Sequence, residues 1–249
     1  MRFFISLAYR GGNYSGWQRQ INALSVQQLI EDALSKALGE QITVTGAGRT
    51  DAGVSASCLF AHFDTNNEIK EPKMVLYKIN AILPSDIIVC QLFKVADNAH
   101  ARFDAVSRSY VYKLHTVKDP FANMSAYYKF PLDVDKMNEA AVYLLGEKDF
   151  SSLEKLCGGN NTSICHVTEA RWEQTAPCHY SFHITANRFL RNMVRATVGT
   201  ILEVGRGRQK PEWVAEVLNK KDRCSAGQSV PAVGLMLTDV KYPYELITL

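Results

Sequence analysis

The chain has 249 residues, of which 47% are hydrophobic and 21% are charged. This balance is typical of a globular protein and excludes bulk disorder, and the length suffices for one large domain or two closely packed ones. The 28 Lys and Arg residues exceed the 25 Asp and Glu residues by a net charge of +3. A protein coated with positive charge is therefore excluded, and any surface for nucleic acid must be local.

In the first half, residues 2–9 predict a strand, and residues 11–20 predict a loop rich in aromatic, amide and guanidinium groups. Ser25 with Gln28 resembles a capping box, and apolar residues then recur at helical spacing to Leu38. The further elements expected here are a strand at 42–45, a tight loop at 46–54, a strand at 57–63, a helix at 73–83 and strands at 87–95 and 107–117.

The second half repeats this alternation of strands and helices. Its expected elements are a helix at 134–145, strands at 169–174 and 181–185, a long helix at 188–204, a helix with Pro211 in its first turn and a last strand at 234–240. We therefore expect an α+β protein with two sheet-and-helix lobes, residues 1–105 and 106–249, around a central cleft.

The cysteine pattern and the apolar segments indicate the compartment. Six cysteines lie at 58, 90, 157, 165, 178 and 224 with no Cys-x-x-Cys pair, which favours reduced thiols in a cytoplasmic protein. The apolar run from Met1 ends too early for a signal peptide, and no segment reaches the ~20 apolar residues of a membrane-spanning helix. A soluble protein without a membrane partner is expected.

The loop at 46–54 is the segment most typical of a functional site. Its three glycines permit a sharp turn and leave room for a ligand, while Asp51 projects from the turn. The spacing satisfies neither the dinucleotide-binding fingerprint nor the phosphate-binding P-loop. From the residues alone, a hairpin loop in which Asp51 caps a turn is the competing interpretation.

A family resemblance favours the catalytic interpretation. The loop contains Gly48-Arg49-Thr50-Asp51-Ala52-Gly53-Val54, which resembles the central motif of the tRNA pseudouridine synthase A family. Other segments that resemble the family follow in order: YSGWQRQ at 14–20, SVQ at 25–27, HARF at 100–103, YVY at 110–112, NRFLRNMVR at 187–195, VG at 198–199 and LEVG at 202–205. The resemblance thus runs through most of the chain.

The resemblance implies the pseudouridine synthase fold with an RNA-binding cleft, a homodimer, and isomerisation of uridine in the anticodon arm of tRNA without a cofactor. It also implies roles for single residues. Asp51 would be the catalytic carboxylate, Arg195 would pair with it, and Tyr110 would stack on the target base. Tyr112, two residues further along the same strand, is the alternative. The arginines expected to bind substrate are Arg49, Arg19, Arg102 and Arg191, with Arg49 entering the space that the extruded uridine leaves.

Arg188, Arg191 and Arg195 recur at spacings of three and four residues, which predicts a stripe along one helix. A solvated helix face is the competing interpretation of this stripe. With Arg10, Arg19, Arg49 and Arg102, Arg188 and Arg191 are expected to line one basic cleft.

Two departures from the family pattern stand out. Ser55 occupies a position where many relatives have histidine, and residues 150–166 lack an arginine-rich character. A zinc site built from Cys157, Cys165, His166, Cys178 and His179 is disfavoured, because no pair has the short spacing of structural sites. We expect no metal.

Two alternative functions remain open. The first is a pseudouridine synthase that acts on another RNA. The second is a non-catalytic RNA-binding protein or RNA chaperone of the same fold, which the joint presence of Asp51, Tyr110 and Arg195 argues against.

Overall fold

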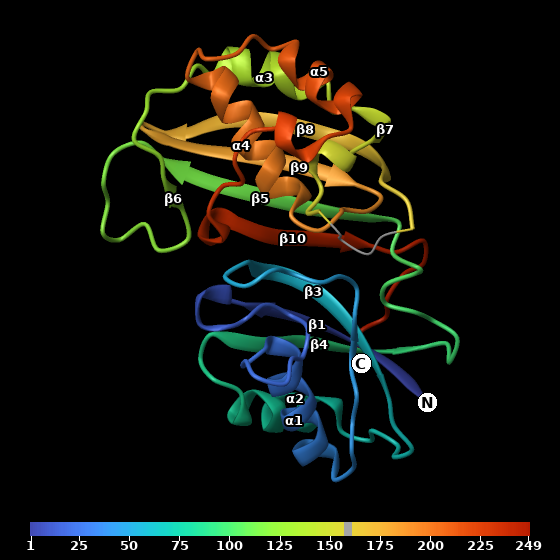
Figure 1. Cartoon of the computed structure of the whole chain (residues 1–249). Helices are drawn as coiled ribbons and strands as arrows, with labels where there is room; N and C mark the ends of the chain where they lie inside the picture. Colours follow the sequence, from blue (N-terminus) through green and yellow to red (C-terminus); the bar gives the residue numbers. More distant parts are fainter. Residues whose placement is uncertain (157–160) are drawn as a thin grey trace. The chain divides into compact units, whose positions relative to one another are not determined.

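The computed structural model describes residues 1–156 and 161–249, which form two compact units (Figure 1). Unit 1 comprises Met1–Val106 and Leu237–Leu249, and unit 2 comprises Ser107–Met236. The C-terminal tail, Leu237–Leu249, was expected in the second lobe because of its place in the sequence, but its contacts place it in unit 1. The carbonyl of Leu237 accepts from Ser57 Oγ at 3.4 Å, and the carbonyl of Lys241 accepts from the Val106 amide at 2.8 Å.

Unit 1 is a sheet with two helices on one face (Figure 1). Its strands are β1 (Arg2–Tyr9), β2 (Thr45–Gly46), β3 (Ser55–Asp64), β4 (Ile87–Val95) and, from Leu237 onward, β10 (Leu235–Lys241), in the order β4-β1-β3-β10 with β2 on β3. The pairs β1–β3, β1–β4 and β2–β3 are antiparallel. The helices α1 (Val26–Leu38) and α2 (Pro72–Ile82) pack on each other. The central strand β1 carries fully buried Phe4, Ile5 and Leu7, so the core of the unit is centred on it.

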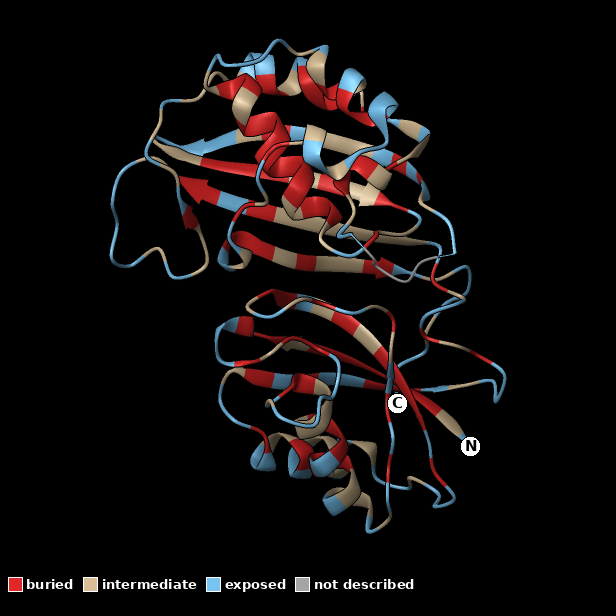
Figure 2. Cartoon of the chain, viewed as in Figure 1, coloured by how far each residue is buried: buried red, intermediate tan, exposed pale blue. Residues whose placement is uncertain are grey.

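Unit 2 has the same general construction. Its sheet order is β5-β9-β8-β7, formed by β5 (Ser107–His115), β9 (His179–Ala186), β8 (Ile164–Ala176) and β7 (Gly146–Asp149), with short β6 (Ala126–Tyr127) parallel to β5. Three helices pack on one face: α3 (Val134–Val142), α4 (Met193–Gly205) and α5 (Trp213–Lys220). Most residues of α4 are buried, as its red colour in Figure 2 shows. The expected α+β class is confirmed.

Several expected elements are confirmed and others differ for identifiable reasons. The strands at 2–9 and 87–95 have the predicted bounds, and Ser25 caps α1 by accepting from the Gln28 amide at 3.3 Å. The strand expected at 42–45 is wrong, because the Val44 amide donates to the Glu31 carboxylate, so only Thr45–Gly46 pair with β3. The short strands β6 and β7 were not expected. Pro211 precedes Glu212, the N-cap of α5, instead of starting the helix.

Candidate functional site

The loop that carries Asp51 ends where β3 begins, beside the end of β1. Thr50 is buried, and its Oγ1 lies 2.8 Å from the Tyr9 hydroxyl. The Asp51 carbonyl accepts from the Val54 amide at 3.1 Å, and Gly53 takes a left-handed φ of 81° to close the turn. Asp51 is half-buried, whereas Arg49 is exposed. A fixed turn therefore holds Asp51 next to an exposed arginine.

The 11–20 loop forms a support behind this turn. The Trp17 amide donates to the Thr50 carbonyl at 3.2 Å, and the Gly53 amide donates to the Tyr14 carbonyl at 3.4 Å. The indole of Trp17 is buried against Tyr9, with ring centroids 6.4 Å apart. Through these contacts the 11–20 loop positions the 46–54 loop that carries Asp51.

Glycines permit the close approach of the two loops. At Gly11, an added Cβ would lie 2.1 Å from the Val54 carbonyl oxygen, and at Gly16 it would lie 2.4 Å from that of Thr50. Gly16 also has a φ of +90°, which side chains disfavour. A third glycine, Gly46, leaves room for the Trp17 indole. At these three positions, a side chain would displace the Asp51 loop or its support.

Ser55, which differs from the expected family pattern, has a local role. Its side chain is buried, and Oγ accepts from the Gly11 amide at 3.1 Å. The hydroxyl thus links the start of β3 to the supporting loop.

Arg19 lies in an ion pair within unit 1. Its Nη1 is 2.9 Å from Oε2 of Glu31, a buried carboxylate that also accepts from the Gln27 side chain and the Val44 amide. The Arg19 side chain is 49% exposed. Arg19 therefore fixes the supporting loop onto α1, and only part of its guanidinium faces solvent.

In unit 2, Tyr110 and Tyr112 have different environments. Tyr112 is buried, its hydroxyl donates to the Pro231 carbonyl at 2.9 Å, and burial raises its pKa well above the usual range. Tyr110 is half-buried, and its ring meets that of Phe189 edge-on, with centroids 5.0 Å apart. Tyr112 is thus a core residue, and Tyr110 is the more exposed of the two. Phe189 lies in the 187–195 motif, but its contact with Tyr110 joins residues distant in the sequence and was not predicted.

Arg195 lies in the first turn of α4 and is held by the segment that precedes β10. Its Nε donates to the Val230 carbonyl at 2.7 Å, and its carbonyl accepts from the Val230 amide at 3.2 Å. Gly199 makes this packing possible, because a Cβ there would lie 1.8 Å from the Gln228 carbonyl oxygen. The family-like VG segment at 198–199 thus has a structural explanation.

The predicted arginine stripe is wrong as a helical feature. Asn192 has a left-handed φ of 67°, and its side-chain amide donates to Ser229 Oγ at 2.7 Å, so α4 begins only at Met193. Arg188 and Arg191 therefore precede the helix that carries Arg195. Arg191 is exposed, and its carbonyl accepts from the Lys155 amide at 2.9 Å.

Arg102 lies at the other end of the unit 1 sheet from Asp51. Its loop is bonded to His62, which pairs with Phe4 near the start of β1, whereas the Asp51 loop is bonded through Thr50 to Tyr9 at the end of β1. Within unit 1, Arg102 and Arg49 therefore do not form one local cluster. The basic cleft proposed for all six arginines stays a prediction.

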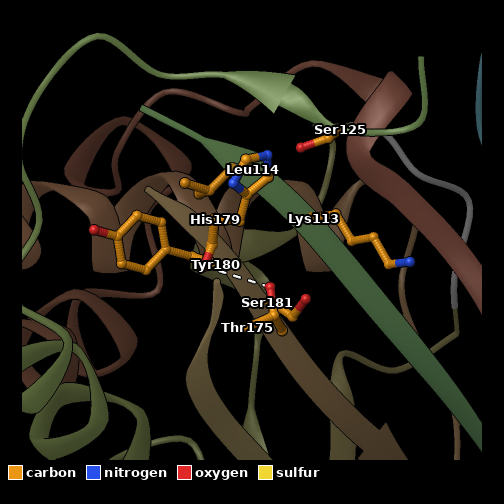
Figure 3. Close-up of a pocket in the computed structure, with 7 residues that line it drawn as sticks. All are labelled: Lys113, Leu114, Ser125, Thr175, His179, Tyr180 and Ser181. Carbon is orange, nitrogen blue, oxygen red and sulfur yellow. Dashed lines mark hydrogen bonds between the residues drawn. The ribbon is translucent and has the colours of Figure 1, made fainter. Parts of the chain in front are cut away.

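The described residues contain no group of three or more potential metal ligands. Cys157, one member of the disfavoured zinc set, lies outside them. A cavity of about 270 Å³ in unit 2 is lined by other residues than those predicted for the site (Figure 3): Lys113, Leu114, Ser125, Thr175, His179, Tyr180 and Ser181. Over the described part of the chain, no helix is long and apolar enough to cross a membrane.

Comparisons with known proteins identify the family. A family model described as tRNA pseudouridine synthase matches residues 140–243. The chain is 49% identical to tRNA pseudouridine synthase A of Parabacteroides distasonis, over 98% of this chain and 97% of that protein. The chain belongs to the tRNA pseudouridine synthase A family. The enzyme of this name from Bacteroides fragilis is 47% identical over 98% of both chains.

Membership of the tRNA pseudouridine synthase A family confirms the resemblance that the motifs indicated, and with it an isomerase of the pseudouridine synthase fold. A solved H/ACA ribonucleoprotein bound to a substrate RNA containing 2′-deoxyuridine gives a TM-score of 0.40 at 14% identity, over 82% of this chain and 44% of that one. That similarity is too low to bear on the fold. The full-length relatives carry the assignment.

Proposed function

We propose that the chain converts uridine to pseudouridine in the anticodon arm of tRNA, with Asp51 as the catalytic carboxylate. The observation that carries the proposal is the 49% identity to a tRNA pseudouridine synthase A over nearly the whole chain. The construction of the Asp51 loop supports it. A buried threonine, a left-handed glycine and a second loop all fix the turn from which Asp51 projects.

The reaction is an internal rearrangement. The bond between C1′ of ribose and N1 of the base breaks, the base turns over while it stays bound, and C1′ joins C5. The proton on C5 then leaves, and N1 takes up a proton. No oxidation or reduction occurs, so the chemistry needs no redox cofactor. An ionised carboxylate is suited to it either as a nucleophile or as a base.

The proposed roles of Tyr110 and Arg195 follow from their surroundings in unit 2. The half-buried ring of Tyr110, supported edge-on by Phe189, is suited to stacking on the target base. The Nε of Arg195 is anchored on the Val230 carbonyl, which fixes the plane of the guanidinium. Arginine in a fixed plane binds a carboxylate with high directional specificity, and we propose that Arg195 acts together with Asp51 in this way.

Arg49 is proposed to occupy the space that the target uridine leaves when it swings out of the RNA. Enzymes that act on a base must extrude it, which leaves a gap in the stack. Arg49 is exposed and lies two residues before Asp51. Arg19, Arg102 and Arg191 are proposed to contact the RNA elsewhere, and we further propose a cytoplasmic homodimer.

The test is to map pseudouridine in total tRNA from cells with and without this protein, and in the same tRNA treated with the purified enzyme. The proposal expects pseudouridine in the anticodon arm only when the protein is present. Pseudouridine that changes only in another RNA would favour the first alternative. Unchanged pseudouridine in every RNA, with RNA binding retained, would favour the RNA-binding protein or chaperone.

A further inference from the structure

The loop between β4 and β5 displays an aromatic ring to solvent. Phe103 is 74% exposed, and the guanidinium carbon of its neighbour Arg102 lies 5.7 Å from the centre of the Phe103 ring. The His100 ring also contacts Phe103, with ring centroids 4.3 Å apart. Phe103 is thus supported from within the protein and presents much of its surface outward.

The backbone of this loop is fixed. All five amide groups from His100 to Asp104 have acceptors within unit 1. Those acceptors are Asp104 Oδ2 for His100, His62 Nδ1 for Ala101, His100 Nδ1 for Arg102 and for Phe103, and the His100 carbonyl for Asp104. The exposure of Phe103 therefore reflects a defined loop conformation and not a loose chain.

A buried imidazole anchors the loop. His62 is 6% exposed, and its ring lies 4.6 Å from that of His100. Burial, reinforced by the charge of Arg2, lowers the pKa of His62 to about 4. His62 is consequently neutral near pH 7, and its Nδ1 can accept the Ala101 amide. The tail adds two further contacts, since the Tyr242 hydroxyl donates to the Ala101 carbonyl and the Tyr244 hydroxyl to Asp104.

The Phe103 loop is remote from Asp51 within the same unit. It is bonded to His62, which pairs with Phe4 in β1, whereas the Asp51 loop is bonded through Thr50 to Tyr9. Phe4 and Tyr9 are five positions apart along the strand, or about 16 Å at roughly 3.3 Å per residue. A molecule that contacts both loops must therefore extend well beyond a single nucleotide.

We propose that Phe103 and Arg102 form a second contact for the tRNA substrate, in which an unpaired base stacks on the Phe103 ring and Arg102 contacts the adjoining phosphate. This inference rests on the proposed function and deepens it. An exposed aromatic ring beside a guanidinium matches the stacking and charge contacts of single-stranded nucleic acid. A protein partner would call for a larger apolar surface, but the two residues that flank Phe103, Arg102 and Asp104, are both charged.

The experiment compares Phe103→Ala with Phe103→Tyr, which keeps the ring, and with Tyr77→Ala. Tyr77 is a matched control because it is 71% exposed on α2 in the same unit. Turnover of full-length tRNA is measured with Asp51 intact, and the affinity for full-length tRNA is measured in the Asp51→Asn background. Circular dichroism checks the fold of each variant.

Phe103→Ala should raise KM and Kd for full-length tRNA about tenfold, with little change in kcat, because one stacked base is lost far from the chemistry. Phe103→Tyr should restore both constants, and Tyr77→Ala should change neither.

Two results would overturn the inference while the proposed function stands. They are an unchanged KM and Kd in Phe103→Ala, and a change in the oligomeric mass of Phe103→Ala that accounts for its weaker binding. A wild-type chain that forms no pseudouridine in any tRNA would instead remove the proposed function and this inference with it.

Discussion

Tyr110 and Tyr112 lie on the same strand, but Tyr112 is buried in the core, whereas Tyr110 is half-buried and is the residue proposed to stack on the target base. Because a stacked base contributes about 1 to 3 kcal/mol, Tyr110→Leu should lower kcat/KM by about tenfold or more. Tyr110→Phe keeps the ring and loses only the hydroxyl, so a lower kcat/KM in Tyr110→Phe than in the wild type would indicate that the hydroxyl has a role in proton transfer.

Tyr112→Phe provides the control for this pair. It removes the hydrogen bond to Pro231 and should cost about 1 kcal/mol of stability with kcat/KM unchanged. Steady-state kinetics and urea unfolding of the three variants check the prediction. Wild-type turnover in both Tyr110 variants would make Tyr110 a strand residue without a role in the site.

His62 makes stability depend on pH in a defined window. Its pKa falls from 6.5 to about 4 in the folded chain, so the unfolded chain binds the proton first as the pH falls. The stability is fully present above about pH 6.5 and is lost progressively toward pH 4, by at most about 3 kcal/mol. His62→Gln removes the titration and keeps a side-chain acceptor for the Ala101 amide. Urea unfolding at pH 7, 6 and 5 should give a steeper decline for the wild type than for His62→Gln, and parallel declines would contradict this account.

At the scale of the element, the 11–20 loop and the 46–54 loop pack closely and position each other. Gly11→Ala places a methyl group against the Val54 carbonyl, whereas a Cβ at Gly12 meets no described atom within 4 Å. Gly11→Ala should therefore lose about 1 to 3 kcal/mol of stability and lower kcat by tenfold or more, because the Asp51 loop must move. Gly12→Ala is the matched control and should behave like the wild type. Equal thermal unfolding temperatures and equal kcat in the two variants would show that the loops are not coupled.

The start of α4 shows where local sequence reasoning ends. The spacing of Arg188, Arg191 and Arg195 is helical, and only the contact of Asn192 with Ser229, 37 residues away, shows that the helix begins later. The segment at 42–45 is similar, because a buried Glu31 takes the amide that a strand would use. The strand β1, the cap at Ser25 and the Asp51 turn were predictable because local pattern and turn chemistry determine them.

At the scale of the whole molecule, the alternation of strands and helices predicted the α+β class. It did not predict the return of the tail to unit 1, which depends on long-range contacts such as that of Tyr242 with Ala101. The site was predictable only as a set of residues with roles taken from the family. Features that position them, such as the Phe189 ring and the Gly199 packing, come from contacts distant in sequence.

Binding of tRNA should depend on salt, because each phosphate contact contributes about 0.9 to the slope of log affinity against log salt concentration. Arg102→Gln should lower the magnitude of this slope by about one. Arg171→Gln is the control, since Arg171 is already paired with Glu169 and Glu173. Filter binding between low and moderate salt provides the measurement, and a flat response in the wild type would contradict the basic surface proposed for the arginines.

The central claim is that the Asp51 carboxylate performs the chemistry, and Asp51→Asn tests it most directly. Asparagine preserves the size and most of the hydrogen-bonding shape of the side chain but removes the charge that a nucleophile or base requires. The measurement is tritium release from tRNA labelled at C5 of uridine, with filter binding and circular dichroism on the same preparations. The account predicts that release falls by several orders of magnitude while tRNA binding and the fold persist. Near-normal release would instead indicate that Asp51 only caps its turn, as asparagine also can, and would contradict the mechanism proposed here.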